Sequence, residues 1–380
     1  MKANQSDPLK VLLIGNYTAD QQQSMLGFAG AMLSGLCARG VDVRLLAPAR
    51  IAGRVGQPHH GVGKWLGYVD KFGLFPPVLR RALAWADVVH ICDQGNAMYV
   101  RHLQGKPHVL TCNDLLAIRA ARGEMSGWTI GRSGRLYQTL ILAGIQQAQH
   151  VVCISDTTRQ DLIRIAPACA NHASVVLEGL LSPYCPMTAV DSAALLQPLG
   201  VKSGEPFLLH VGGNQPYKNR QGVCQIFAAL RAQHGVLPRR LVMAGKPLTA
   251  DIREYIRQNN LQNDVLELTG LNNEQLRALY SRAQALVFPS LYEGFGLPII
   301  EAQACGCPVF TSNRGPMSEV GGDAAVYFDP TLPAQAARVI AENLGRADAM
   351  REAGFRNVQR FTTERMIAEY IDTYQTLLRV

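Results

Sequence analysis

The chain has 380 residues, of which 48% are hydrophobic and 17% are charged, and its net charge is +8. This composition is typical of a globular protein and excludes a disordered one, and the length predicts about two domains. No apolar run reaches the roughly 18 residues of a membrane span, and the polar start MKANQSDPLK lacks a signal-peptide core, so we expect a cytoplasmic protein.

The first half of the sequence alternates short apolar runs with helical patterns. The stretch Ser24 to Gly40 repeats apolar residues at spacings of three and four, which predicts a helix that ends at Gly40. Because the apolar runs are short and nearly continuous, they are typical of buried parallel strands with helices between them. The predicted strands are 10–15, 41–47, 87–92, 108–112 and 150–155.

The second half restarts the same pattern after a stretch with four prolines, Leu180 to Pro206, which we interpret as a linker. Its predicted strands are 206–213, 239–245, 265–270, 285–290, 308–313 and 324–330. The sequence therefore predicts two doubly wound, Rossmann-like α/β domains that face each other across a cleft. The expected parts are a first domain over 1–182, a linker over 183–206, a second domain over 207–362, and a last helix, 363–380, that packs back on the first domain.

Two acids, Glu293 and Glu301, stand between the predicted strand 285–290 and a helix predicted to begin near Pro298. Such a loop lies at the carboxyl end of a strand, where open α/β sheets bind ligands, and the N–H groups at the helix start suit a phosphate. An acid beside a phosphate needs hydrogen-bond donors, and sugar hydroxyls supply them. The pair therefore favours a nucleotide diphosphate sugar as ligand. A surface loop acid followed by an acid near a helix start is the alternative interpretation.

The nine cysteines are an odd number, and several fall in apolar strands, which is typical of reduced core residues. Cys305 and Cys307 form the closest pair, but no further histidine or cysteine completes a metal-ligand set around them. We therefore expect no metal and no cofactor.

Three stretches of the second half resemble the group 1 glycosyltransferase family, whose two-domain fold is called GT-B. Tyr292 to Val309 matches the family pattern of two glutamates separated by seven residues, and Arg314 to Pro330 matches the segment that follows it. His210 to Arg220 is similar to the phosphate-binding loop after the first strand of the family's donor domain. The resemblance implies a donor domain in the second half, an acceptor side in the first, and transfer that retains the anomeric configuration without a metal.

The resemblance also assigns roles to single residues. Glu293 is similar to the acid that contacts the transferred sugar, and Glu301 resembles the acid that contacts the nucleotide ribose. Lys218 resembles the lysine that neutralises the departing diphosphate, although a surface lysine before a helix is the alternative. The implied donor-binding set is Gly212, Gly213, Asn214, Lys218, Arg220, Gly294, Phe295, Gly296, Leu297 and Glu301.

The donor half departs from the family pattern at Gly213, where the family often has an arginine. Arg220 and Lys246 are candidates for the missing cation, and an ordinary surface position is the alternative for each. This departure concerns one phosphate contact and leaves the donor assignment in place.

The first half departs at Asn113, which stands where the family commonly has histidine, while Asp114 is kept. We predict that both are catalytic residues together with Glu293 and Lys218. A plain turn after a strand is the alternative for this Asn-Asp pair. The loop after the first strand, 16–25, also lacks the family's glycine pair.

The sequence thus predicts a retaining hexosyltransferase that moves a hexose from a nucleotide diphosphate sugar to a hydroxyl acceptor, in polysaccharide or lipopolysaccharide assembly. The departures at Asn113 and Gly213 keep open a second hypothesis, a nucleotide-sugar-binding protein of the same fold with lost or altered turnover. Another reaction on this fold, such as epimerisation or phosphorolysis, is disfavoured by the close match to the transferase motif.

The positive charge is uneven, with +6 over residues 1–200 and +2 over residues 201–380, which favours an anionic partner of the first half. We expect no nucleic acid, because no aromatic-basic RNA motif or recognition helix is present. Residues 63–81 predict a peripheral contact with an anionic membrane, which would suit a lipid-linked acceptor. The alternative is a core-facing helix, ended by Pro76 and Pro77, and a loop. This segment mixes Trp65, Leu66, Tyr68, Phe72, Leu74 and Phe75 with Lys64, Lys71, Arg80 and Arg81.

Overall fold

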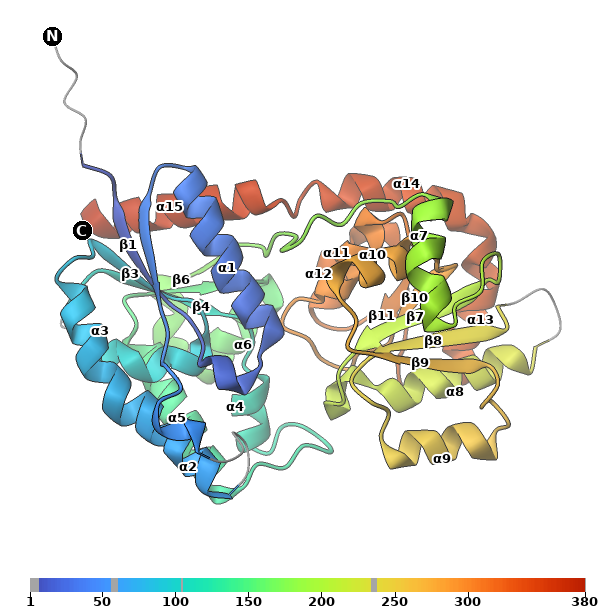
Figure 1. Ribbon diagram of the computed structural model, residues 1–380, viewed down its shortest axis with the longest axis horizontal. Helices are drawn as coiled ribbons and strands as arrows, with labels where there is room; N and C mark the ends of the chain where they lie inside the picture. Colours follow the sequence, from blue (N-terminus) through green and yellow to red (C-terminus); the bar gives the residue numbers. More distant parts are fainter. Residues whose placement is uncertain (1–6, 56–60, 104, 234–237, 380) are drawn as a thin grey trace, which may run out of the picture. The chain divides into compact units, whose positions relative to one another are not determined.

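The structure, a computed structural model, describes residues 7–55, 61–103, 105–233 and 238–379. The chain forms two compact units, one of residues 1–181 with 363–380 and one of residues 182–362. Each unit holds a six-stranded sheet whose strands all pair in parallel and are joined by helices (Figure 1). The predicted fold class, two doubly wound α/β domains, is therefore confirmed.

The sheet of the first unit has the order β2-β1-β3-β4-β5-β6. Its first five strands lie within the five predicted apolar runs. The sixth strand was not predicted, because it is only three residues long and shows no apolar run. The strands are β1 (Lys10–Ile14), β2 (Asp42–Leu46), β3 (Val88–Ile91), β4 (His108–Cys112), β5 (His150–Cys153) and β6 (Ala173–Val175).

Helices cover both faces of this sheet, because successive side chains of a strand point to opposite sides. Val11 and Leu13 of β1 belong to a core shared with α1 and α15. Leu12 and Ile14 belong to the core on the other face, shared with α3 and α5. The helices of this unit are α1 (Gln23–Ala38), α2 (Gly61–Tyr68), α3 (Phe75–Leu83), α4 (Leu116–Ala121), α5 (Arg132–Gln147), α6 (Asp156–Ile165) and α15 (Thr363–Arg379).

The last helix, α15, belongs to the first unit although the second unit precedes it in the chain. His90 of β3 lies 2.7 Å from the hydroxyl of Tyr374 and 2.7 Å from that of Thr111, and the Thr111 hydroxyl lies 2.7 Å from the Tyr370 hydroxyl. Burial lowers the pKa of His90 to about 3, so the imidazole is neutral and binds as a polar core residue. These contacts fasten α15 to β3 and β4.

The sheet of the second unit has the order β12-β11-β10-β7-β8-β9. All six of its strands lie within predicted runs. The direction of the strand order reverses between β7 and β10, and such a switch point is where doubly wound sheets bind ligands. The strands are β7 (Phe207–Gly212), β8 (Arg240–Gly245), β9 (Val265–Thr269), β10 (Ala285–Phe288), β11 (Val309–Ser312) and β12 (Ala325–Phe328).

Helices also cover both faces of the second sheet. The core on one face joins β7, β8 and β10 to α8, α9 and α13, and α11 packs against β10 and β11 on the other. The stretch 183–206, predicted as a linker, contains α7, which packs on α10 within the second unit. The helices are α7 (Ala189–Leu196), α8 (Arg220–Arg231), α9 (Ala250–Gln258), α10 (Asn273–Arg282), α11 (Leu297–Ala304), α12 (Pro316–Gly321), α13 (Pro333–Asn343) and α14 (Ala347–Val358).

The segment 63–81 spans α2, a π-helical stretch (Val69–Leu74) and α3. Pro76 and Pro77 lie in the first turn of α3, so they open a helix and do not end one, as the alternative interpretation required. Within the π stretch, buried Asp70 accepts hydrogen bonds from the backbone N–H groups of residues 51–53 and from the Tyr17 hydroxyl. This carboxylate holds neighbouring loops of the first unit in place.

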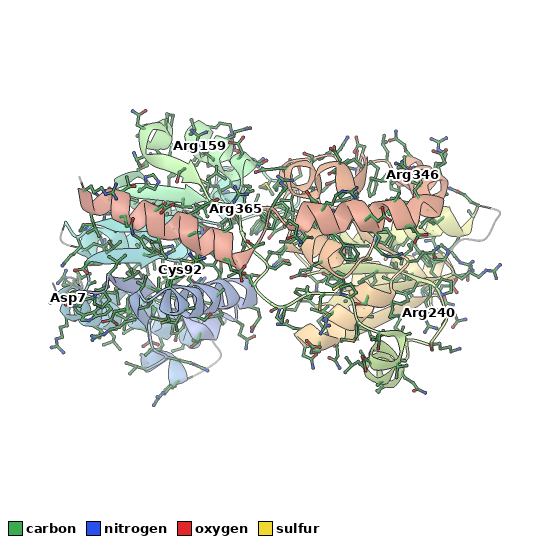
Figure 2. All side chains as sticks on the ribbon, turned by 90° about the horizontal axis from the view of Figure 1, so that it is seen from above. Asp7, Cys92, Arg159, Arg240, Arg346 and Arg365 are labelled. Atoms are coloured by element: carbon green, nitrogen blue, oxygen red, sulfur yellow. The ribbon has the colours of Figure 1, made fainter. Side chains whose placement is uncertain are left out.

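Of the residues labelled in Figure 2, Arg365 and Arg346 are exposed, whereas Cys92 is buried in the first unit. In the described part of the chain, no helix combines the length and apolar character that crossing a bilayer requires.

Candidate active site

The loop that follows β7 passes very close to the end of β8. Gly245 has a φ of +138°, and a β-carbon built on it would lie 2.0 Å from the carbonyl oxygen of Gly212. Only glycine allows this approach. The predicted loop residues Gly212, Gly213 and Asn214 therefore stand where β7 and β8 end side by side.

Arg220, in the first turn of α8, ties these two strand ends together. Its Nη1 group donates to the side-chain oxygen of Asn214 at 2.5 Å and to the backbone oxygen of Lys246 at 2.7 Å. Arg220 is only 3% exposed, so the surface alternative for this residue is wrong. Lys246 itself is exposed. Arg220 therefore links the loops after β7 and β8 by hydrogen bonds.

Asn219 fixes the course of the chain between Lys218 and α8, a role that sequence reasoning missed. Its φ of +52° is unusual for a residue with a side chain, and its amide donates to the backbone oxygens of Pro289 and Pro330 at 3.0 and 3.2 Å. The backbone N–H of Leu291 also donates to the oxygen of Tyr217 at 2.7 Å. The loop after β7 is thereby held against the loop after β10.

This arrangement brings Lys218 and Glu293 into contact. The Lys218 ammonium donates to both carboxylate oxygens of Glu293, at 2.8 and 2.7 Å. The Glu293 side chain is 7% exposed and that of Lys218 is 19% exposed, so the pair is largely shielded from solvent. Two residues predicted as catalytic therefore meet at the switch point of the second sheet, and neither is an ordinary surface residue.

Helix α11 begins directly after this pair. Gly296 precedes the helix with a φ of +103°, and Pro298 occupies the first turn as predicted. The Phe295 side chain is buried against Phe361, with ring centroids 5.7 Å apart. Phe295 can therefore offer a ligand only its backbone. Residues 294–297, from the predicted donor-binding set, form the approach to the helix N-terminus, which suits an anion.

Glu301 lies one turn into α11. Its Oε2 atom accepts a hydrogen bond of 2.8 Å from the hydroxyl of Tyr280 on α10, a partner that sequence reasoning missed. Burial by the surrounding protein raises the pKa of Glu301 to about 7, although the side chain keeps some exposed surface. The hydrogen bond from the Tyr280 hydroxyl and the positive charge of Lys218 act in the opposite direction and lower this pKa. Glu301 is thus poised between its neutral and ionised forms near neutral pH.

His210 lies in β7 beneath the same loops. Its Nδ1 atom lies 3.0 Å from the backbone oxygen of Val287, and its ring stacks on Phe288. Burial lowers the pKa of His210 to about 3, so Nδ1 carries the proton that it donates and Nε2 is an acceptor. Nε2 has no partner among the described residues. In the sequence, His210 stands out only as a polar residue within an apolar run.

Asn113 and Asp114 lie in the first unit, directly after β4. Asn113 is buried and bonds to Asp93 and Gln94, whereas the Asp114 carboxylate accepts a hydrogen bond of 2.9 Å from the N–H of Leu116. The latter bond is typical of a turn that starts a helix. It supports the structural alternative for Asp114, whose catalytic role stays a prediction.

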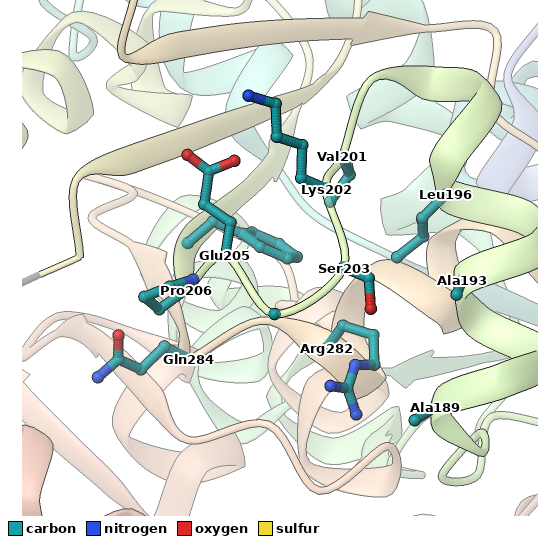
Figure 3. A pocket seen from close by; sticks show the side chains of 12 residues that line it. Ala189, Ala193, Leu196, Val201, Lys202, Ser203, Glu205, Pro206, Arg282 and Gln284 are labelled. Atoms are coloured by element: carbon teal, nitrogen blue, oxygen red, sulfur yellow. The ribbon is translucent and has the colours of Figure 1, made fainter.

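Two other features of the described residues bear on the location of the site. The hollow shown in Figure 3 is lined by α7, residues 201–207, Arg282 and Gln284, so it lies by the start of β7 and not by the loop after its end. Among the described residues, no group of three or more metal-ligating side chains comes together.

The two parallel six-stranded sheets and the shielded loops at the second switch point define a protein of the GT-B fold. Among solved structures, Anabaena HepE in complex with UDP and glucose aligns with a TM-score of 0.70 at 18% identity, over 97% of this chain and 100% of that one. WaaG, a glycosyltransferase involved in lipopolysaccharide biosynthesis, aligns with a TM-score of 0.69 at 16% identity, over 96% and 99%.

Sequence comparison identifies the family. The model of "Glycosyl transferases group 1" matches residues 191–354, and that of "Glycosyltransferase Family 4" matches residues 28–179. Residues 191–354 thus form a group 1 glycosyltransferase domain. The chain is 27% identical to O-antigen chain mannosyltransferase B of Escherichia coli over 61% of this chain and 62% of that protein. It is 26% identical to alpha-maltose-1-phosphate synthase of Mycobacterium tuberculosis over 91% and 92%.

Proposed function

We propose that the protein transfers a hexose from a nucleotide diphosphate sugar to a hydroxyl acceptor, with retention of configuration, in the assembly of a polysaccharide or lipopolysaccharide. The observation that carries this proposal is the Lys218–Glu293 pair in front of α11, with Glu301 one turn further on. The O-antigen mannosyltransferases among the relatives support the polysaccharide context, and the UDP-glucose complex of HepE supports the donor class.

In this proposal the diphosphate lies against the N-terminus of α11 and the Lys218 ammonium. Negative charge grows on the diphosphate as the bond to the sugar breaks, and a cation already in place stabilises it. The Glu293 carboxylate, which holds Lys218 in the free protein, accepts hydrogen bonds from hydroxyls of the transferred sugar. Glu301 accepts hydrogen bonds from the ribose hydroxyls. Lys218 supplies the neutralising charge without a metal, as the family resemblance implies.

A second candidate function is a nucleotide-sugar-binding protein with lost or altered turnover. It is favoured by Gly213, which offers no cation, and by the pairing of Lys218 with Glu293, which offsets the positive charge.

The two functions differ in turnover. Incubation with UDP-, GDP- and ADP-linked glucose and mannose, without acceptor, should give slow hydrolysis of one donor if the protein is a transferase. Tight binding of a donor with no released sugar favours the binding protein, and neither binding nor hydrolysis rejects both.

Lys218→Ala should weaken binding of a nucleoside diphosphate by about tenfold or more, the value of one charge-assisted contact. Binding of the matching nucleoside should stay within about twofold, because the nucleoside has no phosphate. Calorimetry with UDP and uridine, and with GDP and guanosine, measures both. The exposed Lys202→Ala is the control, and the double variant Lys218→Ala with Glu293→Gln separates loss of the cation from exposure of the acid. Equal weakening of nucleotide and nucleoside would remove Lys218 from the phosphate site.

We also propose that the acceptor is lipid-linked and that the first unit rests on an anionic membrane through α2 and α3. Val62 is 72% exposed and Trp65 is 62% exposed, and the basic residues Lys64, Arg80 and Arg81 are exposed nearby in the sequence. Lys71, in contrast, pairs with Asp20, and Phe75 is buried, so these two do not belong to the contact.

Replacing Lys64, Arg80 and Arg81 with Gln should release the protein from anionic vesicles at low salt, because each basic residue contributes about 1 kcal/mol near such a surface. Co-sedimentation with vesicles of phosphatidylglycerol and phosphatidylcholine measures this. The matched control replaces Arg338, Arg346 and Arg356, three exposed arginines of the second unit, with Gln. If the parent protein stays in the supernatant at low salt, the membrane proposal is wrong.

A further inference from the structure

The second unit contains a hollow at the opposite end of β7 from the Lys218–Glu293 pair (Figure 3). It encloses about 220 Å³ between α7, the loop of residues 201–206 and the turn from α10 to β10. Because β7 runs from Phe207 to Gly212, its two ends lie roughly 17 Å apart at ~3.3 Å per residue. A small ligand in the hollow therefore cannot touch the residues that we assign to the donor.

One wall of the hollow is apolar. Ala189, Ala193 and Leu196 share one face of α7, because residues three or four positions apart in a helix are neighbours. Val201 and Phe207 complete this wall. Pockets for drug-sized ligands begin at roughly 300 Å³, so the volume excludes a nucleotide sugar and suits a body of about the size of one monosaccharide. The C–H groups of a sugar ring can be buried against such a wall.

A guanidinium group without a partner stands at the hollow. Arg282, the last residue of α10, is exposed, and its side chain forms no ion pair or hydrogen bond with the described residues. Arg277 on the same helix, in contrast, pairs with Glu274 at 3.2 Å. The planar fork of a guanidinium binds a phosphate or a carboxylate through two parallel hydrogen bonds. Arg282 is therefore available to an anionic group of a ligand.

The other charged side chains of the hollow do not neutralise Arg282. Among the described residues that line the hollow, Glu205 is the one acid, and it accepts a hydrogen bond of 3.0 Å from Arg240. In Figure 3 the Lys202 ammonium and the Arg282 guanidinium point in opposite directions, so the two cations do not form one site. The hollow therefore offers a place for one anionic group, at Arg282.

Polar groups of the lining suit hydroxyls. Ser203 contributes a hydroxyl, which can donate or accept a hydrogen bond, and Gln284 contributes an amide. The side-chain oxygen of Gln284 is buried and has no donor among the described residues, and a ligand hydroxyl would supply one. The lining thus combines an apolar wall, a cation and groups that bind hydroxyls.

We propose that this hollow is a second binding site, separate from the donor site, for a monosaccharide that carries one anionic group, a phosphate ester or a carboxylate. Arg282 binds the anionic group, the ring packs on α7, and Ser203 and Gln284 bind hydroxyls. The occupant contacts α7, the start of β7 and the end of α10. The inference goes beyond the proposed transfer and does not depend on it, because it uses none of the residues assigned to the donor.

NMR on the full chain tests the site with four probes. Glucose 6-phosphate and glucuronate are the anionic sugars, whereas glucose and inorganic phosphate each carry only part of the required chemistry. Saturation transfer detects the sugars, and phosphorus line broadening detects the phosphates. At least one anionic sugar should bind, more tightly than glucose or phosphate, and the tighter of the two identifies the anionic group. Phosphate that binds as tightly would indicate an adventitious ion only. That result, equal binding of glucose, or no binding of either anionic sugar would overturn the proposal.

Variants of the lining locate the bound sugar. Arg282→Gln should weaken binding about tenfold or more, the value of a hydrogen bond to a charged group. Ala193→Leu keeps every polar group but fills the hollow, so it should weaken binding at least as much. The matched control is Arg338→Gln, an exposed arginine of α13, which should bind like the parent. Thermal melting establishes that each variant is folded. Unchanged binding in folded Arg282→Gln would overturn the proposal.

Two further measurements separate this site from the donor site. The anionic sugar should bind equally well to Lys218→Ala, and it should stay bound in the presence of saturating UDP or GDP. Loss of binding in either case would place the probe in the donor site and overturn the proposal. Binding that depends on Arg282, in a protein that hydrolyses no donor, would uphold the second site while the proposed transfer fails.

Discussion

Glu293→Gln is expected to lower the rate of sugar transfer by about one to two orders of magnitude, since loss of one charged contact costs roughly 1.5–3 kcal/mol. The carboxylate holds Lys218 through two hydrogen bonds of 2.7 and 2.8 Å. A neutral amide cannot hold the ammonium in the same way, and it binds sugar hydroxyls less strongly. Initial rates with saturating donor measure the loss, and binding of the nucleoside diphosphate should persist.

The same substitution should also lower the free energy of unfolding, because Glu293 is 7% exposed and its partner would remain. A loop acid that contacted only a ligand would leave stability unchanged. The matched control is Glu205→Gln, which breaks an ion pair of 3.0 Å with Arg240 at the start of β7, away from the proposed site. If Glu293→Gln melts like the control and keeps turnover within about twofold of the parent, the assigned role is wrong.

Glu301→Gln is expected to stabilise the protein above pH 7 while it weakens nucleotide binding. The pKa of Glu301 is raised in the folded state to about 7, from an ordinary value of 4.5. The folded state therefore binds more protons than the unfolded one between these values, and stability falls as pH rises through this window. Glutamine does not ionise, so its advantage should be near zero around pH 4.5 and on the order of 2–3 kcal/mol above pH 7. Melting curves from pH 5 to 8.5 measure the difference.

Affinity for a nucleoside diphosphate should rise with pH, whereas the stability of the protein falls. If the ionised carboxylate accepts the ribose hydroxyls, affinity for UDP or GDP should rise about tenfold between pH 6 and pH 8, as the ionised fraction rises. Glu301→Gln should abolish this rise. Tyr280→Phe removes the hydroxyl that lowers the pKa of Glu301 and should move the rise to higher pH. A pH-independent affinity in the parent protein would contradict the ribose contact.

Periodicity predicted most of the fold because eleven of the twelve strands lie within apolar runs. The central strands, such as β3, β4, β10 and β11, are buried on both faces. The strand β6 escaped because Ala173, Ser174 and Val175 are only three residues, too few to show a pattern. The prolines at 76 and 77 were misjudged in the alternative interpretation of 63–81 for a local reason. A proline can either end a helix or open one, and the sequence does not say which turn of the helix it enters.

The candidate site was predictable in its loops but not in its contacts. The spacing of Glu293 and Glu301 across a strand-to-helix loop follows from local pattern alone. The Lys218–Glu293 pair joins residues 75 positions apart, and the roles of Asn219 and His210 depend on which strands become neighbours. The surface alternative for Arg220 was wrong because no local signal reveals that a charged side chain will be buried between two loops.

The contacts of α15 with β3 and β4 have a consequence for the order of folding during synthesis. Residues 182–362 form a continuous insert, so the second unit can collapse on its own as soon as it has left the ribosome. The first unit is translated earlier, yet Tyr370 and Tyr374, which cover His90 and Thr111, arrive only with the segment 363–379. The face of its sheet that α15 covers together with α1 therefore stays incomplete until the later unit has been made. A ribosome that stalls before Thr363 would release a chain whose second half is complete and whose first half is exposed to aggregation and proteolysis.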